Sequence, residues 1–352
     1  GFEWDASDKL ALRAGNSSDS RMVITWNSGG VPFQWGSLSA AQQNSLNTPP
    51  AGGAPDALGQ QRLEFLRGWS ANEGPLPGQF RERTFVVEDV PTHKILGDII
   101  DSSPVYVGSP QAGYSDVQQP GYLAFRQANV NRKPVIYVGA NDGMLHGFDV
   151  SSTYVGGVSV PTATSGDEVL AYVPGRVFQK LSKLTSQTYR NAHQFYVNST
   201  PMMGDADLSN GAGTDWRTVL VGALAHGGQA YFALDVTNPS AFSEANAGSL
   251  AMWEFTDADD ADLGYTFNQP ALDPLRNVAA QIVRMNNGKW AAIVGNGYNN
   301  TEADGHASAT GHAVLYILYL NGPSAGTWTQ GTDYIKLETG SGSTLSPNGL
   351  ST

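Results

Sequence analysis

The fold is decided by residues 97–150, which begin Gly97-Asp-Ile-Ile-Asp-Ser-Ser-Pro-Val-Tyr-Val-Gly108 and end Pro134-Val-Ile-Tyr-Val-Gly-Ala-Asn-Asp-Gly-Met-Leu-His-Gly-Phe-Asp-Val150. Runs dense in Val, Ile and Tyr favour strands, and a proline suits the first position of a strand. Asn141-Asp142-Gly143 stands between two runs and tolerates the left-handed conformations that a tight hairpin needs. The pattern predicts a four-stranded antiparallel meander. Its strands are expected at 104–107, 134–139, 144–150 and 168–174.

The same four-strand unit returns twice along the chain. The second strand of each unit ends in the same pair of residues, Val138-Gly139, Val221-Gly222 and Val294-Gly295. Repeated four-strand units with variable connections are typical of a β-propeller. Strands are expected at 199–203, 216–222, 229–236 and 250–255 in the second unit, and at 269–272, 289–295, 313–320 and 334–337 in the third.

Residues 97–352 are therefore interpreted as the first part of an all-β propeller domain, with blades at about 97–175, 195–256 and 265–340. A propeller hides its strand edges when the ring closes, and rings have at least about four blades. Ser351-Thr352 matches Ser199-Thr200, which stands just before the opening proline of the second unit. A further blade is thus expected to follow. The sequence predicts an incomplete ring, and so a fragment of a larger propeller.

Residues 1–96 do not follow the repeat and form a small, partly helical N-terminal segment. Ser39 is a possible N-cap of its first expected helix, and Asp56 is a possible cap of the second. The segment is expected to pack on the repeats and to lend a strand that closes the ring. Its expected strands are 21–26 and 84–87, and its expected helices are 39–46 and 60–66.

The composition argues against several classes of function. The chain has 352 residues, no cysteine and a net charge of −12, whereas a nucleic-acid partner needs a basic surface. Without cysteine there is no disulfide, thiolate metal site or cysteine nucleophile. The longest apolar run, 313–320, is far shorter than the roughly 20 residues of a membrane span, so no span is expected. No phosphate-binding loop or nucleophile elbow is present, and no catalytic residue is assigned.

A series of motifs stands in one order along the chain: Leu38-Ser-Ala-Ala-Gln-Gln43, Arg62-Leu-Glu-Phe-Leu-Arg-Gly68, Leu96–Gly108, Ala140–Asp149, Thr218–Gly222 and Gly288–Tyr298. Together they resemble the C-terminal propeller domain of the type IV pilus tip adhesin and biogenesis family, the PilC/PilY family. The resemblance covers about residues 38–337. It implies a modified seven-bladed propeller of the quinoprotein-dehydrogenase-like type.

The resemblance also implies a function and a place. The family supports pilus biogenesis, opposes retraction and mediates attachment to host-cell or abiotic surfaces, without catalysis. Its expected partners are the minor and major pilins and the N-terminal half of the same protein. The expected location is the pilus tip or cell surface, associated with the outer membrane, after export through the periplasm of a Gram-negative bacterium. The resemblance also implies a role in twitching motility and in virulence.

A calcium site belongs to what the resemblance implies, and residues 205–215 contain a candidate loop. Calcium takes about six to eight hard oxygens, often from alternate positions of one loop that glycine bends. Counted from Asp207, alternate positions reach Asp215. Glycine and serine stand where the family has acids or Asn, so binding is expected to be weak, and a solvent-exposed hairpin is the alternative. The expected ligands are side-chain oxygens of Asp207, Ser209 and Asp215 and the carbonyl of Gly213.

Other acids and histidines have structural interpretations. The cluster Asp257–Asp262 and the pair Asp167/Glu168 are expected to be solvated loop acids, with a metal site and a catalytic dyad as the respective alternatives. His306 and His312, on a loop rich in Gly, Ala and Ser, are an alternative transition-metal pair. His146 and His226 are expected to be hydrogen-bonded structural histidines, and Asp149 and Asp235 to accept turn amides.

Two other functions remain open at this stage. A quinoprotein-type dehydrogenase shares the bare propeller repeat, but it needs a cofactor-stacking Trp and a compact calcium–quinone site, which the sequence does not locate. A generic propeller scaffold of a surface protein would lack the motifs at 38–43 and 62–68. The pilus module is the function that the sequence favours.

Overall fold

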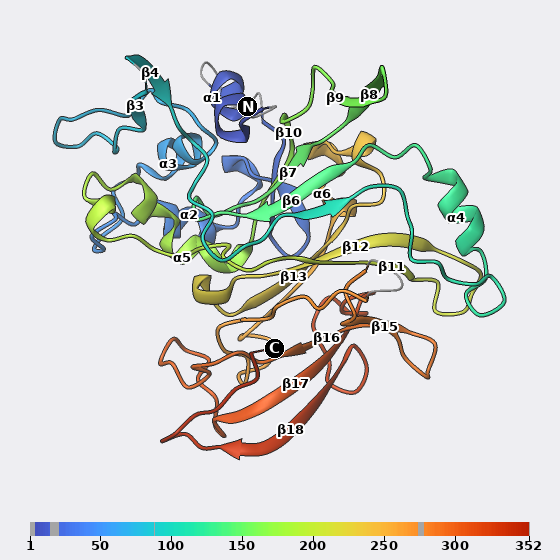
Figure 1. Cartoon of the computed structure of the whole chain (residues 1–352). Coiled ribbons are helices and arrows are strands. Elements are labelled where there is room, and N and C mark those ends of the chain that lie inside the picture. The colour runs from blue at the N-terminus through green and yellow to red at the C-terminus, as the bar shows by residue number, and fades with distance from the viewer. Residues whose placement is uncertain (1–3, 15–20, 88, 274–277, 352) are drawn as a thin grey trace.

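The computed structural model describes residues 4–14, 21–87, 89–273 and 278–351. Three antiparallel four-strand units lie one beside the next, in the order in which they occur along the chain (Figure 1). The predicted all-β architecture of four-stranded units is confirmed. The first unit consists of β5 (Val105–Val107), β6 (Val135–Gly139), β7 (Leu145–Asp149) and β10 (Glu168–Val173).

The second and third sheets repeat this up-and-down order, and each strand pairs with the next along the chain. The second sheet consists of β11 (Met202–Asp207), β12 (Trp216–Ala223), β13 (Ala230–Asp235) and β14 (Ala251–Thr256). The third consists of β15 (Ile282–Arg284), β16 (Trp290–Gly295), β17 (His312–Tyr319) and β18 (Tyr334–Gly342).

The glycine at or next to the end of each second strand makes room for another part of the chain. A side chain at Gly139 would place its Cβ 2.3 Å from the carbonyl oxygen of Val197, in the segment that leads into the second sheet. At Gly295 the Cβ would lie 2.2 Å from the carbonyl oxygen of Leu350. At Gly222 it would meet the ring of Phe232 at 2.1 Å. The recurring Val-Gly pair therefore reflects close approach at the same end of every sheet.

The first strand of the third sheet does not lie where the sequence predicts it. The prediction is 269–272, but β15 begins at Ile282, and Leu272 forms only an isolated bridge with Ala279. The amide of Ala279 donates to the carbonyl of Met203, so the chain runs along the second sheet before it turns into the third. The residues after Pro270 therefore form a connection, and that prediction is wrong.

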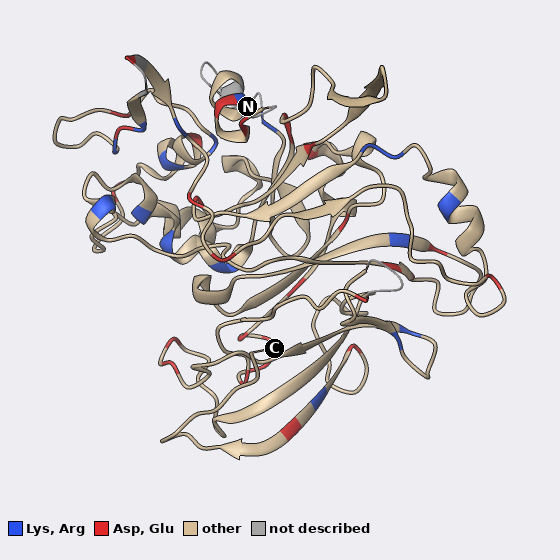
Figure 2. Ribbon diagram, viewed as in Figure 1, with Lys and Arg blue, Asp and Glu red and all other residues tan. Residues whose placement is uncertain are grey.

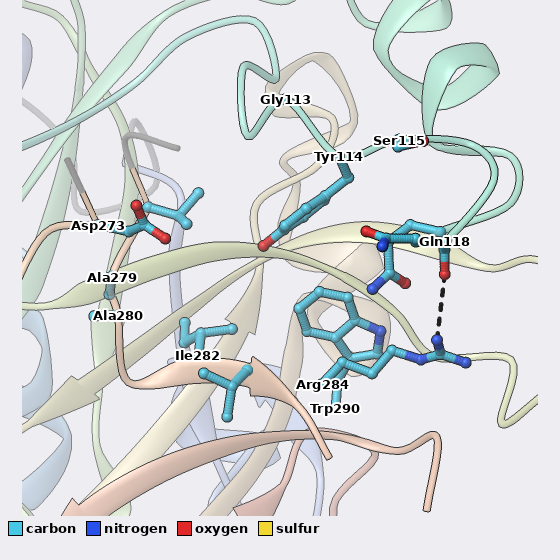
Figure 3. A pocket seen from close by; sticks show the side chains of 13 residues that line it. Gly113, Tyr114, Ser115, Gln118, Asp273, Ala279, Ala280, Ile282, Arg284 and Trp290 are labelled. Carbon is cyan, nitrogen blue, oxygen red and sulfur yellow. Dashed lines mark hydrogen bonds between the residues drawn. The ribbon is translucent and has the colours of Figure 1, made fainter. Parts of the chain in front are cut away.

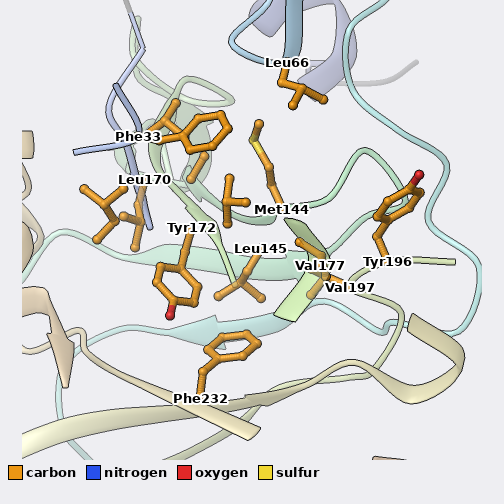
Figure 4. Packing of buried hydrophobic residues seen from close by; sticks show 14 of the residues in the cluster. Phe33, Leu66, Met144, Leu145, Leu170, Tyr172, Val177, Tyr196, Val197 and Phe232 are labelled. Atoms are coloured by element: carbon orange, nitrogen blue, oxygen red, sulfur yellow. The ribbon is translucent and has the colours of Figure 1, made fainter. Parts of the chain in front are cut away.

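The hydrophobic core lies between neighbouring sheets. Leu145 and Tyr172 of the first sheet face Phe232 of the second, and all three are fully buried (Figure 4). Phe255 of the second sheet contacts Tyr316 of the third, with ring centroids 5.2 Å apart. Burial of apolar surface contributes roughly 25 cal/mol per Å². The second sheet is thus held by apolar packing on both of its faces.

The N-terminal segment contains the two expected helices together with several strands and a further helix. Ser39 caps α2 (Ala40–Asn47) through a complete capping box with Gln42, as predicted. Asp56 does not cap α3 (Gly59–Leu66), because its carboxylate instead pairs with the Arg62 guanidinium inside the helix. The expected strand β3 (Thr84–Val87) pairs with β4 (Val90–His93), and α1 (Ala6–Ala14), which the sequence does not predict, precedes them.

This segment lends two strands to the first sheet. β1 (Val23–Trp26) runs parallel to β10, and β2 (Gly30–Pro32) pairs with β1 on its far side. The prediction that the segment lends a strand is confirmed. However, β1 and β2 extend the outer edge of the first sheet and do not join two ends of a ring. The outer edge of β10 would otherwise be unpaired, and β1 covers it with backbone hydrogen bonds.

The connections carry structure that the sequence does not predict. They contain α4 (Tyr122–Ala128), the hairpin of β8 (Ser152–Val155) and β9 (Val158–Pro161), α5 (Phe178–Leu181) and α6 (Ala247–Leu250). Most strand positions are uncharged, and the charged residues of the strands stand singly or in pairs, such as Lys336 and Glu338 of β18 (Figure 2). Among the helices of the described residues, none has the length and apolar character that crossing a bilayer requires.

Candidate functional site

Six ring side chains form a continuous row at one end of the three sheets, and we call them the ring row. The centroids of neighbouring rings lie 4.4–5.4 Å apart. His226 and Tyr298 are 42% and 44% exposed, and His193 is 35% exposed, while the other three are half-buried. In spatial order the row consists of His193, Phe195, His226, Phe267, Tyr298 and Tyr265.

The ring row spans three sheets because of where its members stand in the repeat. His226 lies between β12 and β13, and Tyr298 lies between β16 and β17. The other members lie in the segments that lead from the last strand of one sheet to the first strand of the next. In an up-and-down sheet these two kinds of connection come to the same end. The topology thus gathers the rings on one end of the molecule, which we call the row face.

Carboxylates and apolar side chains border the ring row. The Nε2 atom of His193 lies 3.0 Å from Asp98, and the Nδ1 atom of His226 lies 3.6 Å from Asp101. Between these two acids, Ile99 and Ile100 are 42% and 54% exposed. Exposed rings stack on planar or apolar groups, and ring faces and carboxylates both attract cations. The row face therefore suits an apolar partner that carries positive charge or amide donors.

The backbone holds the ring row in place. The amide of Tyr265 donates to the carbonyl of Tyr298 at 2.7 Å, which fixes one connection to the next. Ala225 and Asn299, which adjoin His226 and Tyr298, have φ angles of 50° and 61°. Positive φ is costly for a residue with a side chain and persists only where the surroundings impose it. The rings are thus presented by a rigid backbone.

Near the row, a half-buried arginine ties two connections together. The guanidinium of Arg176 lies 2.8 Å from Asp257 and 2.7 Å from Asp304. Asp257 is 2% exposed, so the expectation of a solvated acidic loop is wrong at this residue. Burial raises the pKa of Asp257 to about 6, although the charge of Arg176 acts in the opposite direction.

Two further acids of the cluster, Asp260 and Asp262, are also buried. Lys336 of β18 lies 2.9 Å from Asp260 and 2.5 Å from Asp262. The hydroxyls of Tyr316 and Tyr334 donate to Asp260 at 3.0 and 2.8 Å. These partners come from the third sheet, and they allow the carboxylates to leave water. The cluster is therefore a structural network between the second and third sheets, and not a solvated loop.

One acid of the pair Asp167/Glu168 is buried among charged partners. Glu168 is 1% exposed, and its carboxylate lies 2.7 Å from both Arg21 and the Nδ1 atom of His146. Burial alone would raise the pKa of Glu168, but the charges and hydrogen bonds of Arg21 and His146 together outweigh it and lower the pKa to about 2. The expectation of a solvated acid is wrong here, because Arg21 arrives from the N-terminal segment.

Two predicted structural roles are confirmed. His146 is fully buried, and its Nε2 atom lies 3.1 Å from Asp142. Burial alone would lower the pKa of His146, but Asp142 and Glu168 raise it to about 9. Asp149 and Asp235 accept the amides of Ser151 and Thr237, as turn-capping acids do.

The alternative of a transition-metal site receives no geometric support. His312 pairs with Glu338 of β18 at 3.0 Å, and Asp304 is taken by Arg176. Within the described residues, no group of three or more His, Asp or Glu side chains is arranged to hold a metal ion. Ion pairs with Arg176 and Glu338 therefore occupy the acid and the histidine of the loop at 299–312 that a metal would need.

Comparisons with known proteins show which family the chain belongs to. The sequence profile of the PilY1 beta-propeller domain matches residues 96–352. The chain belongs to the PilY1 β-propeller family. It is 38% identical over 357 residues to the type IV pilus biogenesis factor PilY1 of Pseudomonas aeruginosa strain PAK, which covers 99% of this chain and 25% of that protein. A PilY1 homolog of Xylella fastidiosa is 37% identical over 263 residues, which are 72% of this chain and 18% of that protein.

The chain spans about a quarter of the length of the Pseudomonas relative. Among solved structures, the crystal structure of the PilY1 C-terminal domain of Pseudomonas aeruginosa is 35% identical, with a TM-score of 0.46; the match covers 70% of this chain and 39% of that one. Membership of the PilY1 family confirms the resemblance and the propeller fold predicted from the sequence.

In the folded loop that is expected to bind calcium, the expected ligands bond to one another and to Arg217. One carboxylate oxygen of Asp207 accepts the amides of Ser209 and Asp215, at 3.0 and 2.7 Å. The Ser209 hydroxyl donates to the carbonyl of Gly213 at 3.0 Å, and Asp215 pairs with Arg217 at 2.9 Å. All four expected ligands are thus engaged by the loop's own donors or by a cation. Calcium binding at this PilY1-family loop stays a prediction that the geometry does not favour.

Sequence reasoning missed the ring row, although a signal for it exists. Two of its members follow the Val-Gly pair of their unit, His226 four residues after Gly222 and Tyr298 three residues after Gly295. A search for ring side chains within four positions after each Val-Gly pair would have found these two. It would not have found Phe195 or Phe267, because the connections that hold them differ in length.

Proposed function

We propose that this chain is the propeller part of a type IV pilus biogenesis factor, which works by binding and not by catalysis. In this proposal the chain lies at the pilus tip or cell surface of a Gram-negative bacterium. It binds pilins and the remainder of its own protein, and it attaches the pilus to a host-cell or abiotic surface. These contacts support pilus assembly and oppose retraction.

Two observations support the proposal. The relatives are named as pilus biogenesis factors and not as enzymes. The row face supplies a surface suited to binding, since rings and isoleucines lie exposed between carboxylates on a rigid backbone. The ring row is the observation that carries the binding role, because exposed rings are costly in a folded protein and are typical of interaction sites.

The experiment replaces two exposed rings in the full protein of the parent bacterium, as His226→Ser with Tyr298→Ser. The matched control is Tyr154→Ser, which removes an exposed tyrosine from the β8–β9 hairpin at the other end of the sheets. We expect the double variant to reach the surface at the parent level while surface attachment and twitching fall at least about fivefold. The control should behave as the parent.

The measurements are surface immunoblots, counts of pili and attachment assays. Normal attachment and motility by a double variant that is present at the parent level would contradict the role of the row face. A strain that lacks the whole propeller but still assembles and retracts pili normally would contradict the biogenesis role.

A further inference from the structure

The end of the sheets opposite the row face carries a cavity that the proposed function does not use. Residues 109–133, here called the strap, leave the first sheet and cross the second to reach the third. The indole of Trp216 donates to the carbonyl of Pro120 at 2.9 Å, and Arg284 of β15 donates to the carbonyl of Gln118 at 3.3 Å. A cavity of about 340 Å³ lies between the strap and the third sheet (Figure 3).

The cavity wall contains a buried donor without an acceptor. Trp290 is 2% exposed, yet its indole Nε1 atom has no hydrogen-bond partner among the described residues. Buried polar groups in folded proteins are nearly always paired, so an unpaired one calls for an explanation. By contrast, Trp253 and Trp328 donate to the carbonyls of Leu320 and Glu254 at 2.9 and 2.6 Å. In Figure 3 the indole nitrogen of Trp290 faces the side of the cavity where Gln118 and Arg284 lie.

The lining combines ring surfaces with polar groups. The ring of Tyr114 lies 5.5 Å from that of Trp290, tilted by 58°, so the two rings form an angled wall. Ser115, Gln118 and Arg284 add a hydroxyl, an amide and a guanidinium to the lining, all from exposed residues. The volume lies near the lower end of small-molecule sites, which hold roughly 300–1,000 Å³.

We propose that this cavity binds a saccharide of one or two rings. A sugar presents a face of C–H bonds, which stacks on the electron-rich face of an aromatic ring. Its hydroxyl and ring oxygens accept hydrogen bonds, and one of them would accept from the Trp290 indole. Its hydroxyls also donate, and the side-chain oxygens of Ser115 and Gln118 can accept. A saccharide matches the stacking surface, the buried donor and the polar rim together.

Other ligand classes match fewer of these features. A wholly apolar ligand would leave the indole N–H unpaired and would strip water from the polar rim without replacement. A phosphorylated ligand would meet the guanidinium of Arg284 but also the carboxylate of Asp273, in a chain of net charge −12. The Trp290 donor belongs to the third sheet and Gln118 belongs to the strap, so a bound sugar would bridge two separate parts of the chain.

The test titrates the purified chain with glucose, galactose, mannose, N-acetylglucosamine and their disaccharides. Tryptophan fluorescence and saturation-transfer NMR report binding. Trp290→Phe keeps a ring and removes the donor, and Arg284→Met removes the guanidinium from an exposed position where the fold is not at risk. We expect at least one sugar to bind with a Kd below about 10 mM, and each substitution to raise the Kd at least about fivefold.

Trp253→Phe is the matched control, because its indole donates to the carbonyl of Leu320 and its side chain does not line the cavity. Without sugar, Trp290→Phe should lower the melting temperature less than Trp253→Phe, because both lose buried ring volume but only Trp253 also loses a hydrogen bond. Absence of binding across the panel would overturn the proposal. It would equally be overturned if Trp290→Phe and Arg284→Met both bound sugar as the parent does. A fall in the melting temperature of Trp290→Phe equal to that of the control would show that the indole is already satisfied by water, and would overturn it too. Because these measurements use the purified chain, they stand apart from the pilus phenotypes.

Discussion

Two buried glutamates on the last strands of neighbouring sheets are accommodated in opposite ways. Glu168 on β10 meets Arg21 and His146, and its pKa falls to about 2. Glu254 on β14 has no cation partner among the described residues; it accepts the Tyr172 hydroxyl at 2.6 Å and the Gly175 amide at 2.8 Å. Burial raises the pKa of Glu254 to about 7.

The difference shows how the parts of the molecule are joined. The N-terminal segment brings its own charge, Arg21, into the first sheet, so this joint depends on a buried ion pair. The first and second sheets are joined by apolar packing and by hydrogen bonds to a carboxyl that favours the neutral form. The same substitution, Glu to Gln, should therefore have opposite effects at the two joints.

The largest effect is expected from Glu168→Gln. The substitution leaves the charge of Arg21 buried without its paired carboxylate, while His146 keeps Asp142. Breaking a buried pair in this way costs about 3–5 kcal/mol. Chemical denaturation at pH 7 measures the loss in the free energy of unfolding. The control is Asp215→Asn, which breaks an exposed pair with Arg217 and should cost less than about 1 kcal/mol. Equal losses in the free energy of unfolding for both variants would show that the buried pair contributes no more than an exposed one, and would contradict the proposed role of the Arg21 joint.

Glu254→Gln should stabilise the chain, and only at high pH. The folded-state pKa of about 7 lies above the ordinary value of 4.5. The favourable contribution of the protonated carboxyl is therefore complete below pH 4.5 and is lost as the pH rises through about 7. Gln keeps an acceptor for Tyr172 and Gly175 and does not ionise. We expect equal stability at pH 4.5 and a gain of about 1–3 kcal/mol at pH 8, measured by denaturation at both pH values. A gain of the same size at both would contradict the proposed titration.

Tyr172→Phe should cost about 1 kcal/mol, because it removes one hydrogen-bond donor from Glu254. Tyr137→Phe is its matched control in the same sheet. Tyr137 is fully buried and its hydroxyl has no hydrogen-bond partner within the described part of the chain. Its removal should be neutral or stabilising, since no bond is lost. Melting curves of the two variants test this, and a larger loss for Tyr137→Phe would show that its hydroxyl has an unseen partner.

The smallest effect is expected from calcium. The acids of the 207–215 loop are engaged by amides and by Arg217, so millimolar calcium should change the melting temperature by less than about 1 °C. Thermal scans of the parent and of Asp207→Ala, with and without calcium, measure this. A rise that Asp207→Ala abolishes would establish the site that the family resemblance implies.

The sequence predicts what depends on local pattern. The strands around Val-Gly pairs, the capping box at Ser39 and the turn-capping acids all follow from neighbouring residues. Predictions fail where a distant residue decides the outcome. Asp257 is buried because Arg176 reaches it from 81 positions away, and β15 begins late because residue 279 first binds the second sheet.

The candidate site was less accessible to sequence analysis for a related reason. The ring row consists of single residues from connections of different length, which only the folded topology brings together. The calcium loop shows the reverse case. Its spacing satisfies a pattern, but the pattern does not contain Arg217, whose side chain takes one of the two carboxylates.

The parallel pairing of β1 with β10 has a consequence for mechanical load. Val23 pairs with Ala171 and Thr25 with Val173, so the two strands point the same way. A pull on the chain before β1, opposed by a pull on the chain after β10, acts along both strands and strains all of their hydrogen bonds at once. An antiparallel hairpin such as β12–β13, pulled by its two ends, opens one pair at a time. The N-terminal segment thus forms a shear joint, which would pass traction into the first sheet before it gives way.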